Sequence, residues 1–161
     1  MAIQVGDKLP SGSLGHMGEK GPEALTTDQL FSGKKVILFA LPGAFTPTCS
    51  AQHVPGFVQH ADALKAKGVD TIACMSVNDP FVMDAWGKDR GVGDKVLMLA
   101  DGSAAFTKAI GMELDLTDLG MGLRAKRFAM VVDDGTVTHL AIEENPGALD
   151  TSSAEAVMKV L

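Results

Sequence analysis

Cys49 is the side chain of this sequence that is best placed to do chemistry. It ends the stretch 42–49, PGAFTPTC, which follows the apolar run 36–41. Thr46 is a typical N-cap and Pro47 a typical first helical residue, so Cys49 falls in the first turn of a helix. Free backbone N–H groups and the helix dipole favour an anion there, and hence a reactive thiolate. The alternative is a buried structural cysteine, because cysteine is often buried.

The elements on either side of Cys49 predict a βαβ unit. The run 36–41 is apolar throughout, which indicates a strand buried on both faces. The helix that follows is expected to reach about residue 67, with a kink or a break at Pro55. The next strand is expected at 69–77. This order implies a right-handed crossover that joins parallel neighbours.

Capping and turn signals place the remaining elements. They predict a short helix over 27–31, a helix over 80–90 capped by Asp79, and a strand over 95–100. A short helix capped by Ser103 should end at Gly111, and a Gly- and Met-rich loop should follow over 112–125. The chain should end with a hairpin of strands 126–132 and 136–143 joined at Asp134-Gly135, and with a last helix that starts at a Ser152–Glu155 capping box. We therefore predict one α/β domain over residues 1–161, with a thioredoxin-like fold and helices on both faces of a mixed central β-sheet.

The composition narrows the class of protein. The chain has 161 residues, 46% of them apolar, and a net charge of -6, which argues against a nucleic-acid or anionic-membrane partner. No apolar run approaches the length of a membrane span, and residues 1–7 lack a secretory pattern. We expect a cytoplasmic protein in which the two cysteines form no disulfide framework. No CxxC or four-ligand Cys/His cluster occurs, so we expect no metal and no cofactor.

The residues around Cys49 resemble a known family. Pro42-x-x-x-Thr46-x-x-Cys49 is similar to the PxxxTxxC signature of peroxiredoxins, and further blocks resemble the type II branch, which includes the peroxiredoxin 5-like proteins: 42–50, 53–57, 76–82, 99–103 and 126–128. The resemblance covers nearly the whole chain. It implies thiol-dependent reduction of hydrogen peroxide and organic hydroperoxides. It also implies a homodimer, with glutathione and glutaredoxin, or thioredoxin, as the reductant.

The resemblance also implies roles for four residues. Cys49 would attack a peroxide oxygen as thiolate, and the hydroxyl of Thr46, one turn earlier, would lie beside the sulfur. Arg127 would supply a cation from a distant strand, with Arg124 as the second candidate. Pro42 would shield the thiolate from water. The simpler alternatives are a strand-edge charge for Arg127 and a strand terminator for Pro42.

Weaker candidates for substrate binding are Gly43, Phe45, Thr48 and His53. His53 follows Cys49 by four residues on the same helical face, where it could tune the thiolate, bind a metal with it, or simply pack near the site. Cys74 is expected in the core. It is not expected to resolve oxidised Cys49, which an external thiol should reach from solvent. Four apolar residues of the loop over 112–125 could form a patch at a subunit contact: Met112, Leu114, Leu116 and Met121.

Three other functions use the same cysteine. A thiol–disulfide oxidoreductase on this fold would need the CxxC that is absent. A cysteine hydrolase or acyltransferase needs a histidine base with an orienting acid, and only His53 is local. A peroxide sensor or holdase would oxidise Cys49 as a signal and not as turnover. Peroxide consumption with excess thiol separates the enzyme from the sensor.

Overall fold

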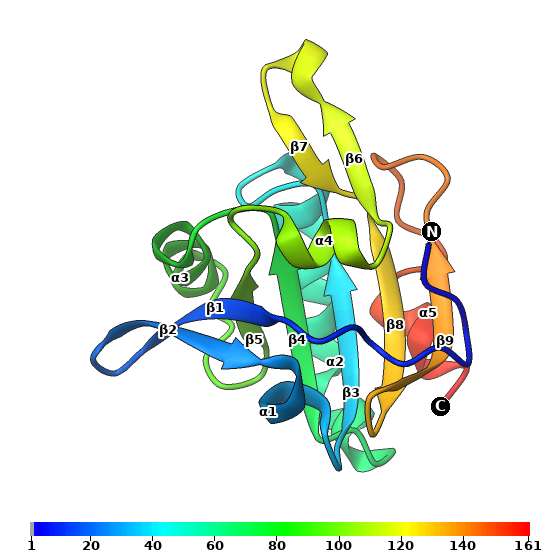
Figure 1. The fold of residues 1–161 in the computed structure, drawn as a ribbon. Helices are drawn as coiled ribbons and strands as arrows, with labels where there is room; N and C mark the ends of the chain where they lie inside the picture. The colour runs from blue at the N-terminus through cyan, green and yellow to red at the C-terminus, as the bar shows by residue number, and fades with distance from the viewer. Residues whose placement is uncertain (1) are drawn as a thin grey trace.

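A seven-stranded mixed sheet forms the centre of the chain in a computed structural model, which describes residues 2–161 (Figure 1). Its strand order is β2-β1-β5-β4-β3-β8-β9, with bounds β1 Ser13–Gly18, β2 Gly21–Thr26, β3 Lys35–Ala40, β4 Thr71–Ser76, β5 Leu97–Ala100, β8 Phe128–Asp133 and β9 Thr136–Ile142. Strands β3, β4 and β5 are parallel, whereas β8 is antiparallel to β3 and β9 to β8. The predicted thioredoxin-like mixed sheet is confirmed.

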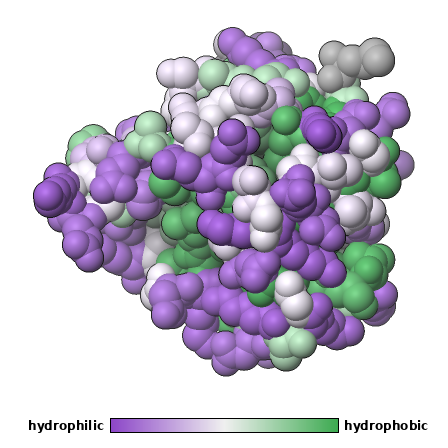
Figure 2. Space-filling view, turned by 60° about the horizontal axis from the view of Figure 1, so that its bottom comes forward, coloured by the Kyte–Doolittle hydropathy of each residue, from purple (hydrophilic) through white to green (hydrophobic). Residues whose placement is uncertain are grey.

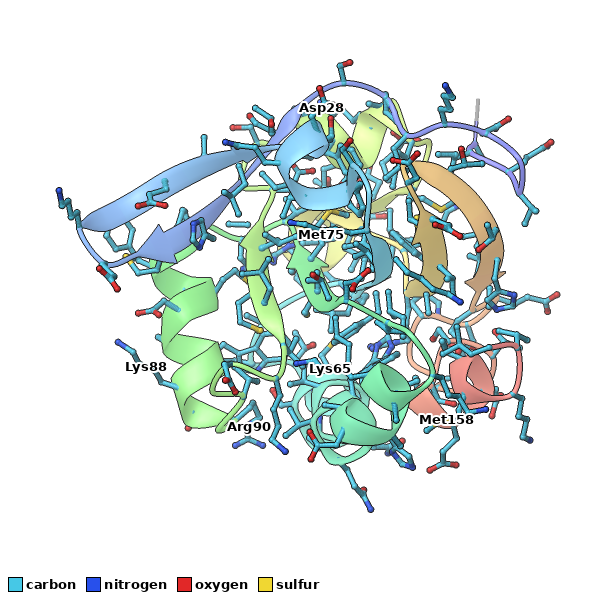
Figure 3. The ribbon with its side chains drawn as sticks, turned by 90° about the horizontal axis from the view of Figure 1, so that it is seen from below. Asp28, Lys65, Met75, Lys88, Arg90 and Met158 are labelled. Carbon is cyan, nitrogen blue, oxygen red and sulfur yellow. The ribbon has the colours of Figure 1, made fainter. Side chains whose placement is uncertain are left out.

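Helices cover both faces of this sheet, as predicted. Their bounds are α1 Thr27–Phe31, α2 Val54–Ala66, α3 Pro80–Asp89, α4 Ala105–Ala109 and α5 Ala154–Met158. Seen from below, Asp28 of α1 lies on one side of the sheet, whereas Lys65 of α2 and Met158 of α5 lie on the other (Figure 3). Successive side chains of β3 alternate between the two faces, so Phe39 joins the core under α2 and Leu38 the core on the opposite face.

A second, two-stranded sheet corrects the predicted loop over 112–125. Strands β6, Glu113–Leu116, and β7, Gly122–Ala125, form an antiparallel hairpin that projects beyond the carboxyl ends of β3 and β4 (Figure 1). A short 3-10 turn, η2 Thr117–Leu119, joins them. The sequence did not predict this hairpin, because its strands are short and glycine is typical of loops. Met112 is fully buried, so it cannot join a surface patch.

Of the caps predicted for α3, α4 and α5, the first is right and the other two are wrong. The Asp79 carboxylate accepts a hydrogen bond from the Val82 N–H, as expected. Helix α4 instead follows Ala104 in a left-handed conformation, and Asp101 accepts from its first N–H groups in place of Ser103. Ser153, not Ser152, caps α5 by accepting from the Ala156 N–H.

The predicted break at Pro55 takes the form of a π-helical turn. This turn, η1 Cys49–His53, precedes α2, and the Val54 N–H bonds the Cys49 carbonyl five residues back. Pro55 has no N–H to continue an α-helical pattern from residue 51, and a one-residue widening of the turn accommodates it. The element that carries Cys49 is therefore irregular.

The lower end of the molecule, opposite the carboxyl ends of β3 and β4, is mainly hydrophilic with small apolar areas between (Figure 2). Within residues 2–161, no helix combines the length and the apolar character that a bilayer crossing requires.

Candidate active site

Cys49 lies where the loop after β3 enters the first helical turn. The Ser50 N–H donates to the Thr46 carbonyl at 2.9 Å, so the helix begins at Pro47 as predicted. The Cys49 side chain is fully buried and packs in the core under α2 with Leu41. In this conformation an external thiol cannot contact the Cys49 sulfur without a local opening.

Arg127 lies beside Cys49 because of the sheet register. Strand β8 runs antiparallel to β3 and pairs Phe128 with Ala40, which brings Arg127 to the carboxyl end of β3. The Arg127 side chain is 2% exposed, and its Nη2 donates to the Cys49 Sγ at 3.0 Å. Its Nε donates to the Pro146 carbonyl at 2.9 Å. The guanidinium is thus fixed toward the sulfur.

The charge of Arg127 has no carboxylate partner among residues 2–161, because none of their ion pairs includes it. A buried cation is costly unless an anion compensates it. The Cys49 Sγ accepts a hydrogen bond from this guanidinium at 3.0 Å. The contact therefore places the buried cation directly against the sulfur.

His53 connects Arg127 to the C-terminal part of the chain. Its Nδ1 accepts from Arg127 Nη1 at 2.7 Å, and because arginine can only donate, the ring proton must lie on Nε2. That Nε2 donates to the Ser152 carbonyl at 2.9 Å. Burial, and then the charge of Arg127, lower the pKa of His53 to about 3, so the ring is neutral at physiological pH.

The His53 ring thus packs and bonds beside the site, one of the alternatives the sequence left open. Within the described residues, no cluster of three His, Cys, Asp or Glu side chains is arranged to hold a metal ion.

The loop 42–46 lies at the same edge of the sheet. The Thr46 hydroxyl donates to the Gly43 carbonyl at 2.7 Å, and no helix N–H within residues 2–161 donates to its oxygen, so the predicted N-cap is absent. Pro42 and Gly43 are buried. A Cβ at Gly43 would lie 3.1 Å from Arg124 Nη1 and 3.3 Å from Thr46 Cγ2, so a larger residue there would displace one of them.

Phe45 and Thr48 contact other parts of the chain. Phe45 is 54% exposed with a φ of 63°, and its ring centroid is 6.3 Å from that of Trp86. Positive φ is strained for a phenylalanine, which indicates a loop held by its surroundings. The Thr48 hydroxyl donates to the Gly147 carbonyl at 3.0 Å. The structure thus places Cys49, Arg127 and His53 in one bonded group, with Thr46 and Pro42 in the adjoining loop.

Arg124, the second candidate for the cation, bonds backbone oxygens instead. Its Nε donates to the Met121 carbonyl at 2.8 Å and its Nη1 to the Val77 carbonyl at 3.3 Å. The first contact lies within the β6–β7 hairpin, and the second ties this hairpin to the loop after β4. Of the two arginines, only Arg127 therefore bonds the Cys49 sulfur.

Several supporting residues escaped the sequence reasoning. Trp86 Nε1 donates to the Ser50 hydroxyl at 2.9 Å and Arg90 Nη1 to the Ser50 carbonyl at 3.0 Å, so α3 holds the turn that carries Cys49. The Asn78 side chain accepts from the Ala44 N–H at 3.0 Å. Of these supporting residues, only Asn78 had a signal in the sequence, because it lies in one of the blocks that resemble peroxiredoxins.

Cys74 lies in the core, as predicted. It is fully buried on β4 opposite Phe39, on the sheet face that α2 covers. Burial, and then the nearby Cys49, raise the pKa of the Cys74 thiol well above its ordinary value, although Arg127 works against them. Cys74 is therefore a thiol at neutral pH and a poor nucleophile.

A buried cysteine bonded by a buried arginine, on a thioredoxin-like sheet, is the arrangement that a thiol-based redox enzyme requires. The redoxin family profile matches residues 4–158. Chloroplastic peroxiredoxin-2E of Arabidopsis thaliana is 52% identical over 164 residues, which cover 99% of this chain and 70% of that protein. Peroxiredoxin-2B of the same plant is 50% identical over 160 residues, covering 99% and 98%.

Solved structures agree with these relatives. Reduced Prx3 from Vibrio vulnificus, crystallised in complex with hydrogen peroxide, superposes with a TM-score of 0.93 at 49% identity, covering 98% of each chain. This chain belongs to the redoxin family, in its type II peroxiredoxin branch. It is a thiol-dependent peroxidase, an oxidoreductase with an antioxidant role.

Proposed function

We propose that Cys49 is the peroxidatic residue, and the hydrogen bond of 3.0 Å from Arg127 Nη2 to its Sγ is the observation that carries the proposal. The thiolate attacks one peroxide oxygen and forms an S–O bond while the O–O bond breaks. Cys49 is oxidised to a sulfenic acid, and the other oxygen leaves as an alkoxide or hydroxide that takes up a proton. Arg127 stabilises the charge that moves along the S–O–O line.

The loop 42–46 completes this proposed site. Thr46 would hydrogen-bond the peroxide, because its hydroxyl can still accept or redirect its proton from the Gly43 carbonyl. Pro42 is buried two residues after the end of β3 and would exclude water from the thiolate. Gly43, Phe45 and Thr48 would shape the loop around the substrate, while His53 would orient Arg127.

We further propose that an external thiol regenerates Cys49, with glutathione and glutaredoxin preferred and thioredoxin as the other candidate. The raised pKa of buried Cys74 argues against an internal partner. A glutathione thiolate would attack the sulfenic sulfur and displace hydroxide, which takes up a proton from solvent and leaves as water. A second thiolate would then attack the glutathione sulfur and release Cys49 as thiolate. Because Cys49 is buried, the turn η1 must open for this step.

A cytoplasmic homodimer remains our proposal for location and assembly. Free Cys49 and Cys74 suit a reducing compartment. Large apolar side chains are exposed at Phe45, Phe81 and Leu119, which suits a subunit contact. Sedimentation of the purified chain over a range of concentrations tests the dimer.

The reductant is tested by comparing wild type, Cys49→Ser and Cys74→Ser. We expect Cys49→Ser to lose peroxide consumption, and Cys74→Ser to retain turnover with glutathione and glutaredoxin. Mass spectrometry after one equivalent of peroxide and glutathione should find the adduct on Cys49. A Cys49–Cys74 disulfide as the main product, with turnover lost in Cys74→Ser, would contradict the external thiol. Full turnover in Cys49→Ser would contradict the site itself.

A further inference from the structure

Glu143 follows the last residue of β9 and lies directly beside Arg127 in the sheet. The Glu143 N–H donates to the Arg127 carbonyl at 2.9 Å, which continues the ladder between β8 and β9 by one residue. The Glu143 residue is 7% exposed, which is unusual for a glutamate without a cationic partner. None of the ion pairs among residues 2–161 includes it. Its burial therefore needs another explanation.

The Glu143 carboxylate organises the segment before α5. One of its oxygens, Oε2, accepts from the Asp150 N–H at 2.9 Å, the Ser152 N–H at 2.8 Å and the Ser152 hydroxyl at 2.6 Å. Burial works to raise the pKa of Glu143, but the bonds from Ser152 and then Asp150 outweigh it, so the net effect lowers that pKa and keeps the group ionised. Ser152 is fully buried and thus fixed in place.

This fixed Ser152 supports His53, and His53 supports Arg127. The Ser152 carbonyl accepts from His53 Nε2 at 2.9 Å, which holds the ring proton on that nitrogen. His53 Nδ1 then remains an acceptor for Arg127 Nη1 at 2.7 Å. The other terminal nitrogen of the guanidinium, Nη2, bonds the Cys49 Sγ at 3.0 Å. An unbroken series of hydrogen bonds thus runs from Glu143 to the sulfur.

We propose that Glu143 is a positioning residue for the peroxidase reaction, acting through Ser152 and His53 to aim Arg127 at Cys49. This inference rests on the roles proposed above for Cys49 and Arg127. Without the carboxylate, the buried Ser152 N–H loses its acceptor, and its carbonyl is no longer held against His53. The ring can then turn or move its proton to Nδ1, which would leave Arg127 Nη1 without an acceptor.

The direct field of Glu143 would act in the opposite direction. A negative charge near the sulfur disfavours a thiolate, so removing that charge alone would make Cys49 ionise more easily. Loss of the hydrogen-bonded support for Arg127 would make Cys49 ionise less easily. The direction of the change in a variant therefore distinguishes positioning from a simple charge effect.

The test compares three substitutions in the Cys74→Ser background, so that ultraviolet absorbance reports only the Cys49 thiolate. Glu143→Met removes the acceptor, Glu143→Gln removes the charge but keeps an acceptor oxygen, and Glu143→Asp keeps the charge but shortens the reach. We expect Glu143→Met to raise the midpoint of the thiolate titration by about one pH unit, and to slow the reaction with hydrogen peroxide about tenfold at pH 7. Glu143→Gln should recover most of both losses, and Glu143→Asp less.

Glu144 is the matched control, because it is the adjacent glutamate and is exposed. Glu144→Met should change neither the midpoint nor the rate. Combining Glu143→Met with His53→Gln should slow the reaction by less than the product of the single effects, because both act on Arg127.

Three results would overturn the proposal. A lower titration midpoint in Glu143→Met would mean that the charge acts directly. A lower melting temperature with unchanged midpoint and rate would mean that Glu143 only stabilises the fold. If Glu143→Met does not fold, the other two variants decide. A Glu143→Asp variant that equals wild type, together with an impaired Glu143→Gln variant, would show that the charge matters and not the positioned acceptor. Because the titration needs no turnover, these outcomes are distinct from a failure of the peroxidase assignment.

Discussion

Replacing His53 should change how the stability of this protein depends on pH. The histidine is neutral in the folded chain because burial and Arg127 lower its pKa to about 3. In the unfolded chain the same ring takes up a proton near pH 6.5. Between these two values the unfolded chain therefore binds one more proton, and the free energy of unfolding must fall as the pH drops.

The size of this effect follows from the two pKa values. Between pH 7 and pH 5 the folded ring stays neutral while the unfolded ring becomes almost fully protonated, which costs about 2 kcal/mol of stability. The full loss is reached only near the folded pKa, at about pH 3. Glu143, whose net pKa shift is downward from 4.5, adds a loss of the same sign as the pH falls below that value. The window from pH 7 to pH 5 therefore separates His53 from the carboxylate.

Urea unfolding at half-unit steps from pH 7 to pH 5 measures this slope. We expect His53→Gln to be less stable than wild type at pH 7 but to lose about 2 kcal/mol less over the window, because glutamine does not titrate. His139 is the control, since burial also lowers its pKa but it is only partly buried. His139→Gln should remove a smaller part of the slope. An identical slope in wild type and His53→Gln would show that His53 is not held neutral by the fold.

Two further predictions concern the site itself. Arg127→Met removes the cation that bonds the sulfur at 3.0 Å, so the thiolate titration should move up by about 1–3 pH units and peroxide reduction at pH 7 should slow at least tenfold. Arg124→Met should do much less, and the reverse order would refute our choice of cation. Thr46→Val should slow the reaction about 10²-fold while losing about 1 kcal/mol for the hydrogen bond to Gly43, and a wild-type rate would exclude a catalytic hydroxyl.

Local signals predicted the first helical turn well and its continuation poorly. Pro47 begins the helix and Asp79 caps α3, because these preferences depend on a few neighbouring residues. Asp134 and Gly135 both have positive φ and join β8 to β9, as an Asp-Gly pair should. The π-helical turn at Cys49–His53 was predicted only as a kink or a break, since Pro55 can be accommodated in several ways.

Local signals failed where another acceptor competes for the hydroxyl of the predicted cap. Ser152 has the sequence pattern of a capping box, but its hydroxyl donates to Glu143 and Ser153 caps the helix instead. The Thr46 hydroxyl likewise donates to the Gly43 carbonyl and accepts from no helix N–H. A serine or threonine hydroxyl can bond any of several nearby groups, because these hydrogen bonds differ little in free energy.

The sequence alone determined the α/β class, the position of Cys49 at a helix start and the resemblance to peroxiredoxins. These depend on hydrophobic periodicity and on residue types within one turn of each other. Only the tertiary structure decided that Cys49 is buried and that Arg127, not Arg124, contacts its sulfur. It also decided that Glu143 bonds Ser152, whose carbonyl accepts from His53. Strand register and the alternation of side chains across the sheet fix those contacts, and both are set by pairing between segments far apart in the chain.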